Sequence, residues 1–367
     1  MTEEQEDVLA LFGVPGVGAK KFARLVEAFG SPRSVFDATD SELLSLDGFG
    51  KAMLKRIRSF DRDAFVDDQK SRMEDCGAAM LIRSSPDYPP LLNSFISAPP
   101  VLFIRGDAAI LSHQSLAYVG TRIPSEYGIN LTRELVSGTV AADMAVVSGM
   151  AAGIDAVAHR TTLDCDGNTV AVFGCSVDII YPRENKNLYN DIIDKGCAVS
   201  HFPMGETPLR GNFPARNAVI VGLSLGTIVV EAPEKSGALI TADLALRAGR
   251  KLFAVPGSAT SKTSRGTNEL LTRGARPVFD IESILSEMGK PVPPNIPKTT
   301  VKRSLPSKPL PSGLKGDIVK VLDDGPLHVD DISAKLGVSV ITINAELPML
   351  EMGGYVRKIP GMVYERV

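Results

Sequence analysis

The sequence predicts an α/β protein whose centre is a doubly wound, mainly parallel sheet with helices on both faces. Two observations predict this fold. Six short apolar runs recur between residues 111 and 288, alternating with segments that have a helical pattern. These runs are continuously apolar, as is typical of parallel strands that are buried on both faces. Repeated strand–helix units favour a doubly wound arrangement.

The expected strands are short, and most of them run into small residues. They are "SLAYVG" at 115–120, "MAVVSG" at 144–149, "TVAVFG" at 169–174, "CAVSHF" at 197–202, "TIVVEA" at 227–232 and "KLFAVPG" at 251–257. The helical patterns between them lie at 127–143, 153–163, 186–196, 215–223 and 238–249.

Composition divides the chain into further parts. Residues 289–313 contain seven prolines, five Lys/Arg and no acidic residue, which indicates an extended basic linker. A second Pro-rich stretch, near "SSPDYPPLL", separates a helical N-terminal segment from the centre. We therefore expect a helical domain at 1–75, the α/β core at 76–288, the linker, and a small domain at 314–367.

Bulk properties narrow the class of protein. The chain has 367 residues, a net charge of −3 and four cysteines without a C-x-x-C pair, which favours a reducing, cytoplasmic location. No apolar run reaches the length of a membrane span, and the acidic start does not resemble a secretory signal. The charge argues against a uniformly basic nucleic-acid binder, but it allows a basic groove on an acidic body.

The residues that follow the expected strands predict an anion-binding crevice. In doubly wound folds, ligands bind beyond the carboxyl ends of the strands. Small, hydroxyl or basic residues follow nearly every strand here, including Gly120-Thr121-Arg122, Ser148-Gly149-Met150 with Gly153, and Ser236-Gly237. Glycines let backbone N–H groups approach a phosphate, and helix N-termini add partial positive charge. Full charges would come from Arg122, Arg183, Lys186, Lys262 and Arg265.

No catalytic apparatus is recognisable in the sequence. Walker A, G-x-S-x-G and H-E-x-x-H patterns are missing, and no Cys/His spacing indicates a metal site. We expect His159 to be a structural, hydrogen-bonded histidine, Asp155 to cap its helix, and Glu231 to orient a loop by accepting backbone N–H bonds. We therefore expect no catalytic residue, no metal and no cofactor.

Several motifs of the central segment resemble the DNA-processing protein A family (DprA, also called Smf). They are "VGTRIPSEYG", "VSGMAAGIDAVAH", "VAVFGCSVDIIYPREN", "FPARNAVIVGLS", "VVEAPEKSGALITADLALRAGRKLFAVPG" and "GTNELLTRGA", in the family's order across most of residues 117–276. The resemblance implies an extended Rossmann-like fold that binds single-stranded DNA in the cytoplasm, forms a homodimer and loads the RecA recombinase during natural transformation.

The resemblance also implies which residues contact DNA. The family's phosphate-contacting arginine falls on Arg122, its basic residue after Tyr-Pro falls on Arg183, and its F-P-x-R-N element supplies Phe213, Arg216 and Asn217. Together with the strand-end residues, the predicted set is Gly120, Thr121, Arg122, Ser148, Gly149, Met150, Gly153, Arg183, Asn185, Lys186, Phe213, Arg216, Asn217, Ser236, Gly237, Lys262, Arg265, Gly266 and Asn268.

Three positions depart from the family pattern. Ala152 and Ala218 stand where the family usually has arginine, and Ser200-His201 stands where a Ser-Glu pair is common. Each lost phosphate contact would reduce the salt slope of single-strand binding by roughly 0.7.

The N-terminal segment resembles a tandem helix-hairpin-helix pair. Gly16-Val17-Gly18 and Gly48-Phe49-Gly50 each precede a helix, and basic residues that include Lys20, Lys21 and Lys51 follow them. Hairpin N–H groups of this kind hold a DNA phosphate without reading bases. The alternative is a helical domain with a purely structural role.

The C-terminal piece resembles a winged helix, with three helical patterns followed by the ribbon "YVRKIPGMVYERV". Its third helix, at 339–352, contains Glu346 and Glu351 and no basic residue, and residues 313–367 hold six Lys/Arg against eight Asp/Glu. Because phosphate attraction needs the opposite sign, we expect this module to bind protein or the dimer partner rather than DNA.

The leading hypothesis is therefore a non-catalytic single-strand binder that mediates recombination. The aromatic content is low, 6%, and the chain has no tryptophan, which favours binding of the DNA sugar-phosphate backbone over extensive stacking of the bases. The alternative is a nucleotide-binding or nucleotide-hydrolysing enzyme of the related Rossmann-like superfamily. Its P-G-G-x-G-T-x-x-E motif is present only as a partial echo in "LSLGTIVVEAPEKSG".

Overall fold

The computed structural model describes residues 1–293, 311–322, 325–359 and 361–366. The chain forms two compact units, Met1–Lys298 and Thr299–Val367, each of which is described by itself. Most of the predicted linker, residues 294–310, lies outside the described residues. Within the described ranges, no helix has both the length and the apolar content that crossing a membrane requires.

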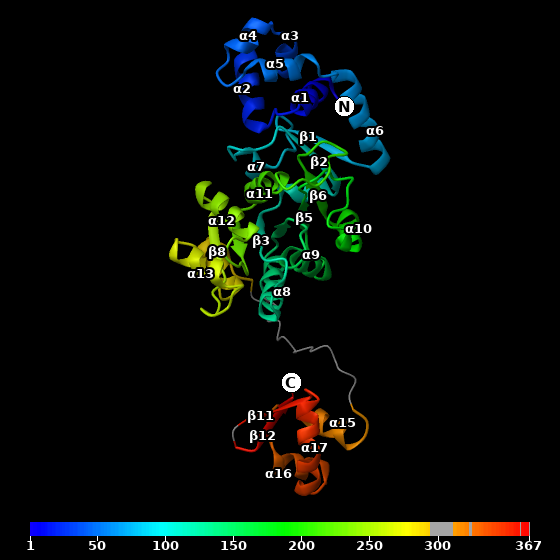
Figure 1. Cartoon of the computed structure of the whole chain (residues 1–367), viewed down its shortest axis with the longest axis vertical. Helices are drawn as coiled ribbons and strands as arrows, with labels where there is room; N and C mark the ends of the chain where they lie inside the picture. Colours follow the sequence, from blue (N-terminus) through cyan, green and yellow to red (C-terminus); the bar gives the residue numbers. More distant parts are fainter. Residues whose placement is uncertain (294–310, 323–324, 360, 367) are drawn as a thin grey trace. The chain divides into compact units, whose positions relative to one another are not determined.

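The first unit is built on a nine-stranded sheet with the order β1-β2-β6-β5-β4-β3-β7-β8-β9 (Figure 1). The strands from β6 to β9 in this order are parallel, as predicted. Their bounds are β3 Ser115–Val119, β4 Ala145–Ser148, β5 Thr169–Val172, β6 Cys197–Ser200, β7 Gly226–Val229, β8 Lys251–Ala254 and β9 Arg276–Pro277.

Three strands were not predicted from the sequence. β1 (Ala79–Ile82) and β2 (Val101–Gly106) pair with each other and join β6 in antiparallel fashion, so the sheet is mixed at this edge. β1 has four residues, β9 has two, and β2 follows a Pro-rich stretch that is typical of a loop. β1 and β9 are too short for a recognisable pattern, whereas β2 does have the apolar run "VLFI" and was missed because prolines precede it.

Both faces of the sheet are buried, which explains the continuous apolar runs. In β3, Ala117 and Val119 pack into one core with α7, α11, α12 and α13, whereas Leu116 and Tyr118 pack into the opposite core with α8, α9 and α14. The helices are α7 Pro90–Asn93, α8 Glu126–Ala141, α9 Ile154–Asp164, α10 Lys186–Lys195, α11 Asn212–Leu223, α12 Gly237–Arg247, α13 Arg265–Thr272 and α14 Ile281–Glu287, with short η1 Ala108–Ser112 and η2 Arg183–Asn185.

The order of the strands fixes where a ligand can bind. From β3 the chain winds outward through β4, β5 and β6, and it then returns to β7 on the other side of β3. The winding direction therefore reverses between β3 and β7. In open α/β sheets the crevice at such a switch point is the usual ligand site.

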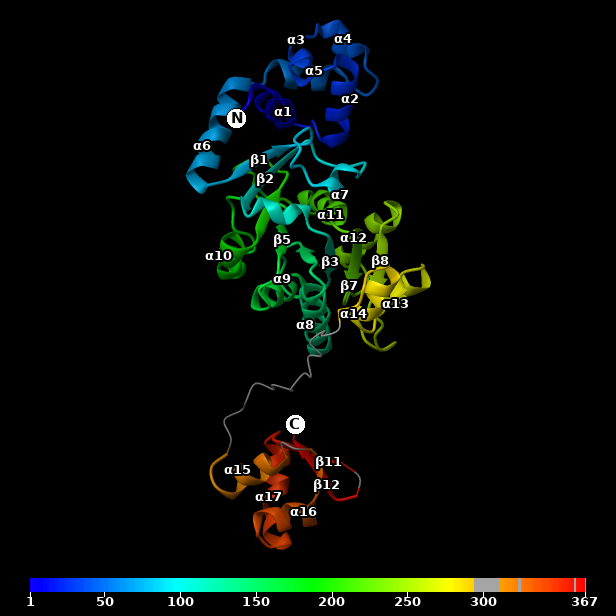
Figure 2. The same cartoon turned by 180° about the vertical axis from the view of Figure 1, so that it is seen from behind.

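Six helices precede the sheet beyond its β1–β2 edge (Figure 2), of which the first five share a core of their own and the sixth packs against β1 and β2. They are α1 Glu3–Gly13, α2 Ala19–Phe29, α3 Pro32–Asp37, α4 Asp40–Ser45, α5 Lys51–Arg58 and α6 Arg62–Cys76. Each predicted hairpin is held by an arginine of the other helix pair, because Arg24 donates to the Asp47 carbonyl and Arg56 donates to the Pro15 carbonyl at 3.3 Å. The tandem hairpins therefore form one cross-linked module.

The second unit is a small winged-helix module. Its helices α15 Leu314–Val321, α16 Val329–Leu336 and α17 Val340–Met352 enclose one apolar core with the three-stranded sheet β10-β12-β11. The strands are β10 Leu327–His328, β11 Val356–Ile359 and β12 Val363–Arg366. Helix α17 leaves Ile341 and Met352 almost fully exposed and carries no basic residue.

Candidate nucleic-acid interface

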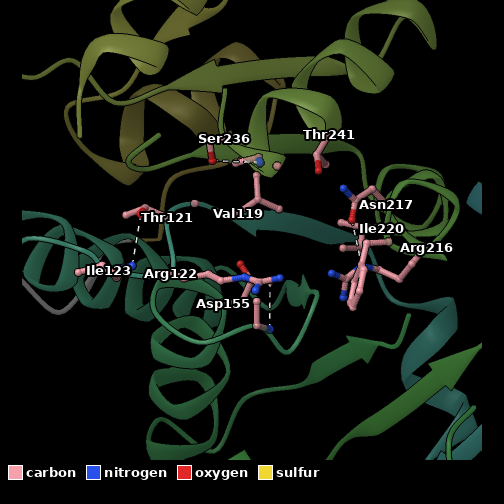
Figure 3. A pocket seen from close by; sticks show the side chains of 15 residues that line it. Val119, Thr121, Arg122, Ile123, Asp155, Arg216, Asn217, Ile220, Ser236 and Thr241 are labelled. Atoms are coloured by element: carbon pink, nitrogen blue, oxygen red, sulfur yellow. Dashed lines mark hydrogen bonds between the residues drawn. The ribbon is translucent and has the colours of Figure 1, made fainter. Parts of the chain in front are cut away.

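A pocket of about 360 Å³ lies at the switch point of the sheet, and we call it the strand-end pocket (Figure 3). The turn after β3 forms one wall, the start of α12 after β7 forms another, and α11 forms a third. Its lining residues are Val119, Gly120, Thr121, Arg122, Ile123, Ala151, Asp155, Phe213, Arg216, Asn217, Ile220, Ser236, Gly237, Ala238 and Thr241. Segments that are more than a hundred residues apart in sequence therefore meet in one hollow.

Two guanidinium groups face this pocket. Arg122 is exposed, and its side chain extends across the pocket toward Arg216 (Figure 3). Among the described residues, no carboxylate forms an ion pair with either arginine. The buried Asp155 carboxylate also lines the pocket and interacts electrostatically with Arg216, so two guanidinium groups face the pocket against one carboxylate, and this excess of positive charge favours binding of an anion.

Arg216 is a buried arginine that holds two strand ends together. It is 6% exposed, and its guanidinium donates to the carbonyl of Val172 at 2.7 Å and to that of Gly149. Burial lowers the pKa of Arg216, and the nearby Asp155 carboxylate opposes this shift. Arg216 therefore supplies a fixed positive charge at the base of the pocket rather than a mobile side chain.

Phe213 separates the strand-end pocket from a smaller adjoining hollow of about 80 Å³. Its ring lies 5.8 Å from that of Tyr181, and the Arg216 guanidinium carbon lies 5.7 Å from its centroid. Arg122 and Gly149 line the smaller hollow as well. The two arginines thus form a cationic surface, and the Phe213 ring lies between its two hollows.

Asp155 organises the turn after β4 instead of capping its helix. The N-cap of α9 is Gly153, and no side chain caps this helix. The Asp155 carboxylate instead accepts from the backbone N–H groups of Gly149 at 3.1 Å and Ala151 at 3.4 Å. Burial raises the pKa of Asp155, while Arg216 and these N–H groups oppose the shift. The predicted capping role of Asp155 is wrong, because the turn after β4 folds back over the start of α9 and brings its N–H groups to the carboxylate.

The same turn requires unusual backbone conformations. Met150 has φ +59° and is buried, and Asn185 donates to its carbonyl at 3.0 Å. Gly153 has φ +81°, and a Cβ there would lie 2.3 Å from the Thr121 carbonyl oxygen. The small residues of "VSGMAAGID" are thus needed first for close packing of two strand-end turns.

Glu231 has the predicted orienting role. It is buried and accepts from the backbone N–H of Ser125 at 2.8 Å, the Ser125 hydroxyl at 2.6 Å and the Thr263 hydroxyl at 3.1 Å. These bonds join the start of α8 to the loop before α13. This one carboxylate therefore fixes the loop before α13 against the start of α8.

The structure brings together part of the predicted DNA-contacting set. Ten predicted residues lie outside both hollows: Ser148, Met150, Gly153, Arg183, Asn185, Lys186, Lys262, Arg265, Gly266 and Asn268. Arg183, Lys186 and Lys262 are exposed, and Arg265 pairs with Glu234 at 3.4 Å. Asn268 holds the Gly257 backbone through two bonds of 3.1 Å. The DNA contacts of all these residues remain predictions.

Sequence reasoning missed several lining residues. Thr241 lies four residues after Gly237, so the period of helix α12 could have indicated it. Ile123 is 83% exposed, and Ile220 lies one turn beyond Arg216. Ala152, at a position where the resembled family has arginine, lines the smaller hollow.

His159 is a structural histidine, as predicted. It is fully buried, and its Nδ1 lies 2.7 Å from the Thr169 hydroxyl. Burial lowers the pKa of His159 to about 3. The native state therefore binds fewer protons than the unfolded chain between about pH 3 and pH 6.5, and stability falls as the pH falls through this window.

We expect the unfolding free energy of the core to be about 2 kcal/mol lower at pH 5 than at pH 7 through His159 alone. A His159→Gln variant should lose this part of the pH dependence, whereas His113→Gln, at an exposed site, should keep it. Urea denaturation at the two pH values measures the difference. An unchanged pH dependence in His159→Gln would contradict the assignment.

The fold and the pocket define a Rossmann-like protein with a cationic crevice at its strand ends and a small helical module on either side of the core in sequence. A family model for DNA recombination-mediator protein A matches residues 79–289. Models for a SAM-like helix-hairpin-helix tandem and for the DprA winged helix domain match residues 8–62 and 302–362. The chain belongs to the DNA recombination-mediator protein A family, whose members are the DNA-processing proteins called DprA or Smf.

Relatives and solved structures support this assignment. Protein Smf of Synechocystis is 33% identical over 99% of both chains, and Protein Smf of Escherichia coli is 32% identical over 88% of this chain and 86% of its own. The structure of DprA from Streptococcus pneumoniae matches with a TM-score of 0.67 at 29% identity, over 78% of this chain and 99% of that one.

A second solved structure concerns nucleic-acid binding. It is that of DNA processing protein A from Helicobacter pylori, described for its single-stranded DNA binding mode. It matches with a TM-score of 0.53 at 30% identity, over 57% of this chain and 95% of that one.

Proposed function

We propose that this protein binds single-stranded DNA through the strand-end pocket and mediates recombination without catalysing a reaction. The observation that carries the proposal is the pair Arg122 and Arg216, which face one hollow where Asp155, near Arg216, is the one carboxylate of the lining among the described residues. An exposed and a buried guanidinium group on two walls of one pocket suit the phosphates of a single strand. The Helicobacter pylori relative, with its described single-strand binding, supports the same substrate.

The proposed biological role is to protect incoming single strands and to load the RecA recombinase on them during natural transformation. We further propose that the protein acts in the cytoplasm as a homodimer. Two pockets in a dimer would hold one strand together, which raises affinity through effective concentration. Weak stacking capacity leaves little preference for sequence, as suits a protein that accepts any incoming strand.

The proposal is tested by single-strand binding over a salt series. We expect Arg122→Ala to weaken binding about tenfold for every sequence and to reduce the salt slope by roughly 0.7. Arg183→Ala should act in the same direction but less strongly, because Arg183 lies outside the pocket. Arg247→Ala, an exposed arginine at the end of α12, is the matched control.

Undiminished binding after loss of Arg122 would contradict the proposed site. For the RecA step, the single-strand-dependent ATPase of RecA should start sooner with the wild-type protein than with Arg122→Ala. If the RecA ATPase starts equally soon with both proteins, RecA loading does not depend on this pocket.

A further inference from the structure

A larger pocket, of about 710 Å³, lies within the first unit between the first hairpin and the core, and we call it the hairpin groove. Residues 12–21, around Gly16-Val17-Gly18, form one wall. Residues 201–203 and helix α11 form the other. Both views show α2 next to α7 and α11 (Figures 1 and 2). The sequence predicts DNA contact for the hairpin wall, but nothing above assigns a role to the opposite wall or to the groove between them.

Two adjacent faces of helix α11 line the two pockets. Phe213, Arg216, Asn217 and Ile220 line the strand-end pocket, whereas Asn212, Ala215, Ala218 and Val219 line the hairpin groove. A helix is about 10 Å across, so the pockets are separated by the width of one helix. The first turn of α11 is accessible between them, because Pro214 and Ala215 are exposed. A strand that leaves the strand-end pocket across this turn enters the groove.

The charge of the groove suits a phosphate chain. Lys20 is exposed and Lys21 is half-buried, and no carboxylate among the described residues pairs with them. Helix α2 begins at the N-cap Gly18 without a side-chain cap, so its first N–H groups are open beside these lysines. Glu206 is the acidic residue of the lining, and two lysines outweigh it.

Aromatic rings form part of the opposite wall. The rings of His201 and Phe202 lie 4.1 Å apart between centroids, at 36°. Burial lowers the pKa of His201 to about 4, so this imidazole is neutral at neutral pH. Uncharged rings beside a basic rim are the combination that binds unpaired bases with little sequence preference.

The second hairpin shares the uncapped helix start, at Gly50, and an exposed lysine, Lys51, but it lacks the groove and the aromatic wall, so it provides an internal comparison. It is not part of the groove lining. Phe49 is buried at its centre, and Arg24 both donates to the Asp47 carbonyl and lies 5.7 Å from the Phe49 ring. The two hairpins therefore differ in surroundings although their sequences are alike.

We propose that the hairpin groove holds the next nucleotides of the single strand bound in the strand-end pocket, with phosphates beside Lys20 and Lys21 and a base against Phe202. This inference rests on the proposed function. According to this proposal, the first hairpin is part of a single-strand binding site, whereas the second hairpin has a structural role.

The first test uses the lack of tryptophan in the chain. A Phe202→Trp variant carries one fluorophore in the groove, and a Phe36→Trp variant carries one in α3, away from α11 (Figure 1). Both are titrated with oligothymidines of about 4 to 16 nucleotides. We expect quenching in Phe202→Trp only with the longer oligonucleotides, and none in Phe36→Trp. Equal behaviour of the two variants at every length would overturn the proposal.

The second test measures affinity. The double variant Lys20→Ala/Lys21→Ala should bind long oligonucleotides with a salt slope reduced by roughly 1.4, which corresponds to two contacts, and should bind short ones like wild type. Lys51→Ala/Lys55→Ala, at exposed positions of the second hairpin's helix, is the matched control and should be unchanged. Arg122→Ala should weaken binding at all lengths.

The outcomes distinguish the two proposals. If Arg122→Ala weakens binding and the hairpin variant equals wild type, the groove proposal fails and the proposed function stands. If Arg122→Ala has no effect, the proposed function fails at its own site.

Discussion

Replacing Arg216 by methionine is expected to lower the unfolding free energy of the core by about 3–5 kcal/mol and to weaken single-strand binding by more than tenfold. The variant leaves the carbonyls of Gly149 and Val172 without a donor, and it leaves the buried Asp155 carboxylate without its nearby positive charge. Urea denaturation and fluorescence anisotropy measure the two effects. Arg247→Met, at an exposed position, should change stability by less than about 0.5 kcal/mol.

A double variant separates stability from binding. Adding Asp155→Asn to Arg216→Met removes the uncompensated charge, so the double variant should be more stable than Arg216→Met alone. Its single-strand binding should stay weak, because the positive charge at the base of the pocket is still missing. Arg216→Met with wild-type stability would show that the buried guanidinium has no structural role.

Replacing Gly153 by alanine is expected to be the second most damaging change. The backbone there has φ +81° and ψ −128°, which residues with a Cβ rarely adopt. The added Cβ would also lie 2.3 Å from the Thr121 carbonyl oxygen and 2.8 Å from the Arg122 Cα. We expect a loss of about 3 kcal/mol, or roughly 6–12 °C in the transition temperature of the core.

The Gly153→Ala change should also reduce DNA affinity, because the clash displaces the turn that carries Arg122. Gly237→Ala is the matched control for stability: Gly237 lines the same pocket, yet a Cβ there would meet nothing within 4 Å. Calorimetry of both variants is decisive. Equal transition temperatures would mean that the turns after β3 and β4 do not pack as described.

Sequence reasoning predicted the parallel part of the sheet because each strand is a continuous apolar run. The runs at 116–119 and 145–147 are apolar at successive positions, and the structure buries both of their faces. It missed β1 and β9 because four and two residues are too few to show a pattern. It missed β2, although residues 101–104 are a continuous apolar run, because the Pro-rich stretch before them is typical of a loop.

The site was predicted in part for a similar reason. Gly120, Arg122 and Ser236-Gly237 were found because each follows a strand, and strand ends meet at one edge of a parallel sheet. Asp155 was assigned a local capping role, but its carboxylate bonds to the preceding turn. The predicted and observed roles of Asp155 differ because the backbone changes direction at Met150. Met150 has a positive φ, which no sequence rule predicts for a methionine.

The sequence by itself determined the α/β core, the tandem hairpins, the winged helix and the family, because apolar periodicity and ordered motifs are local properties of the chain. Only the tertiary structure decided that Arg122 and Arg216 face one pocket, and that the first hairpin, unlike the second, lines a groove against α11. The physical reason is that packing brings together side chains from segments far apart, and charge and cavity shape arise only from that packing.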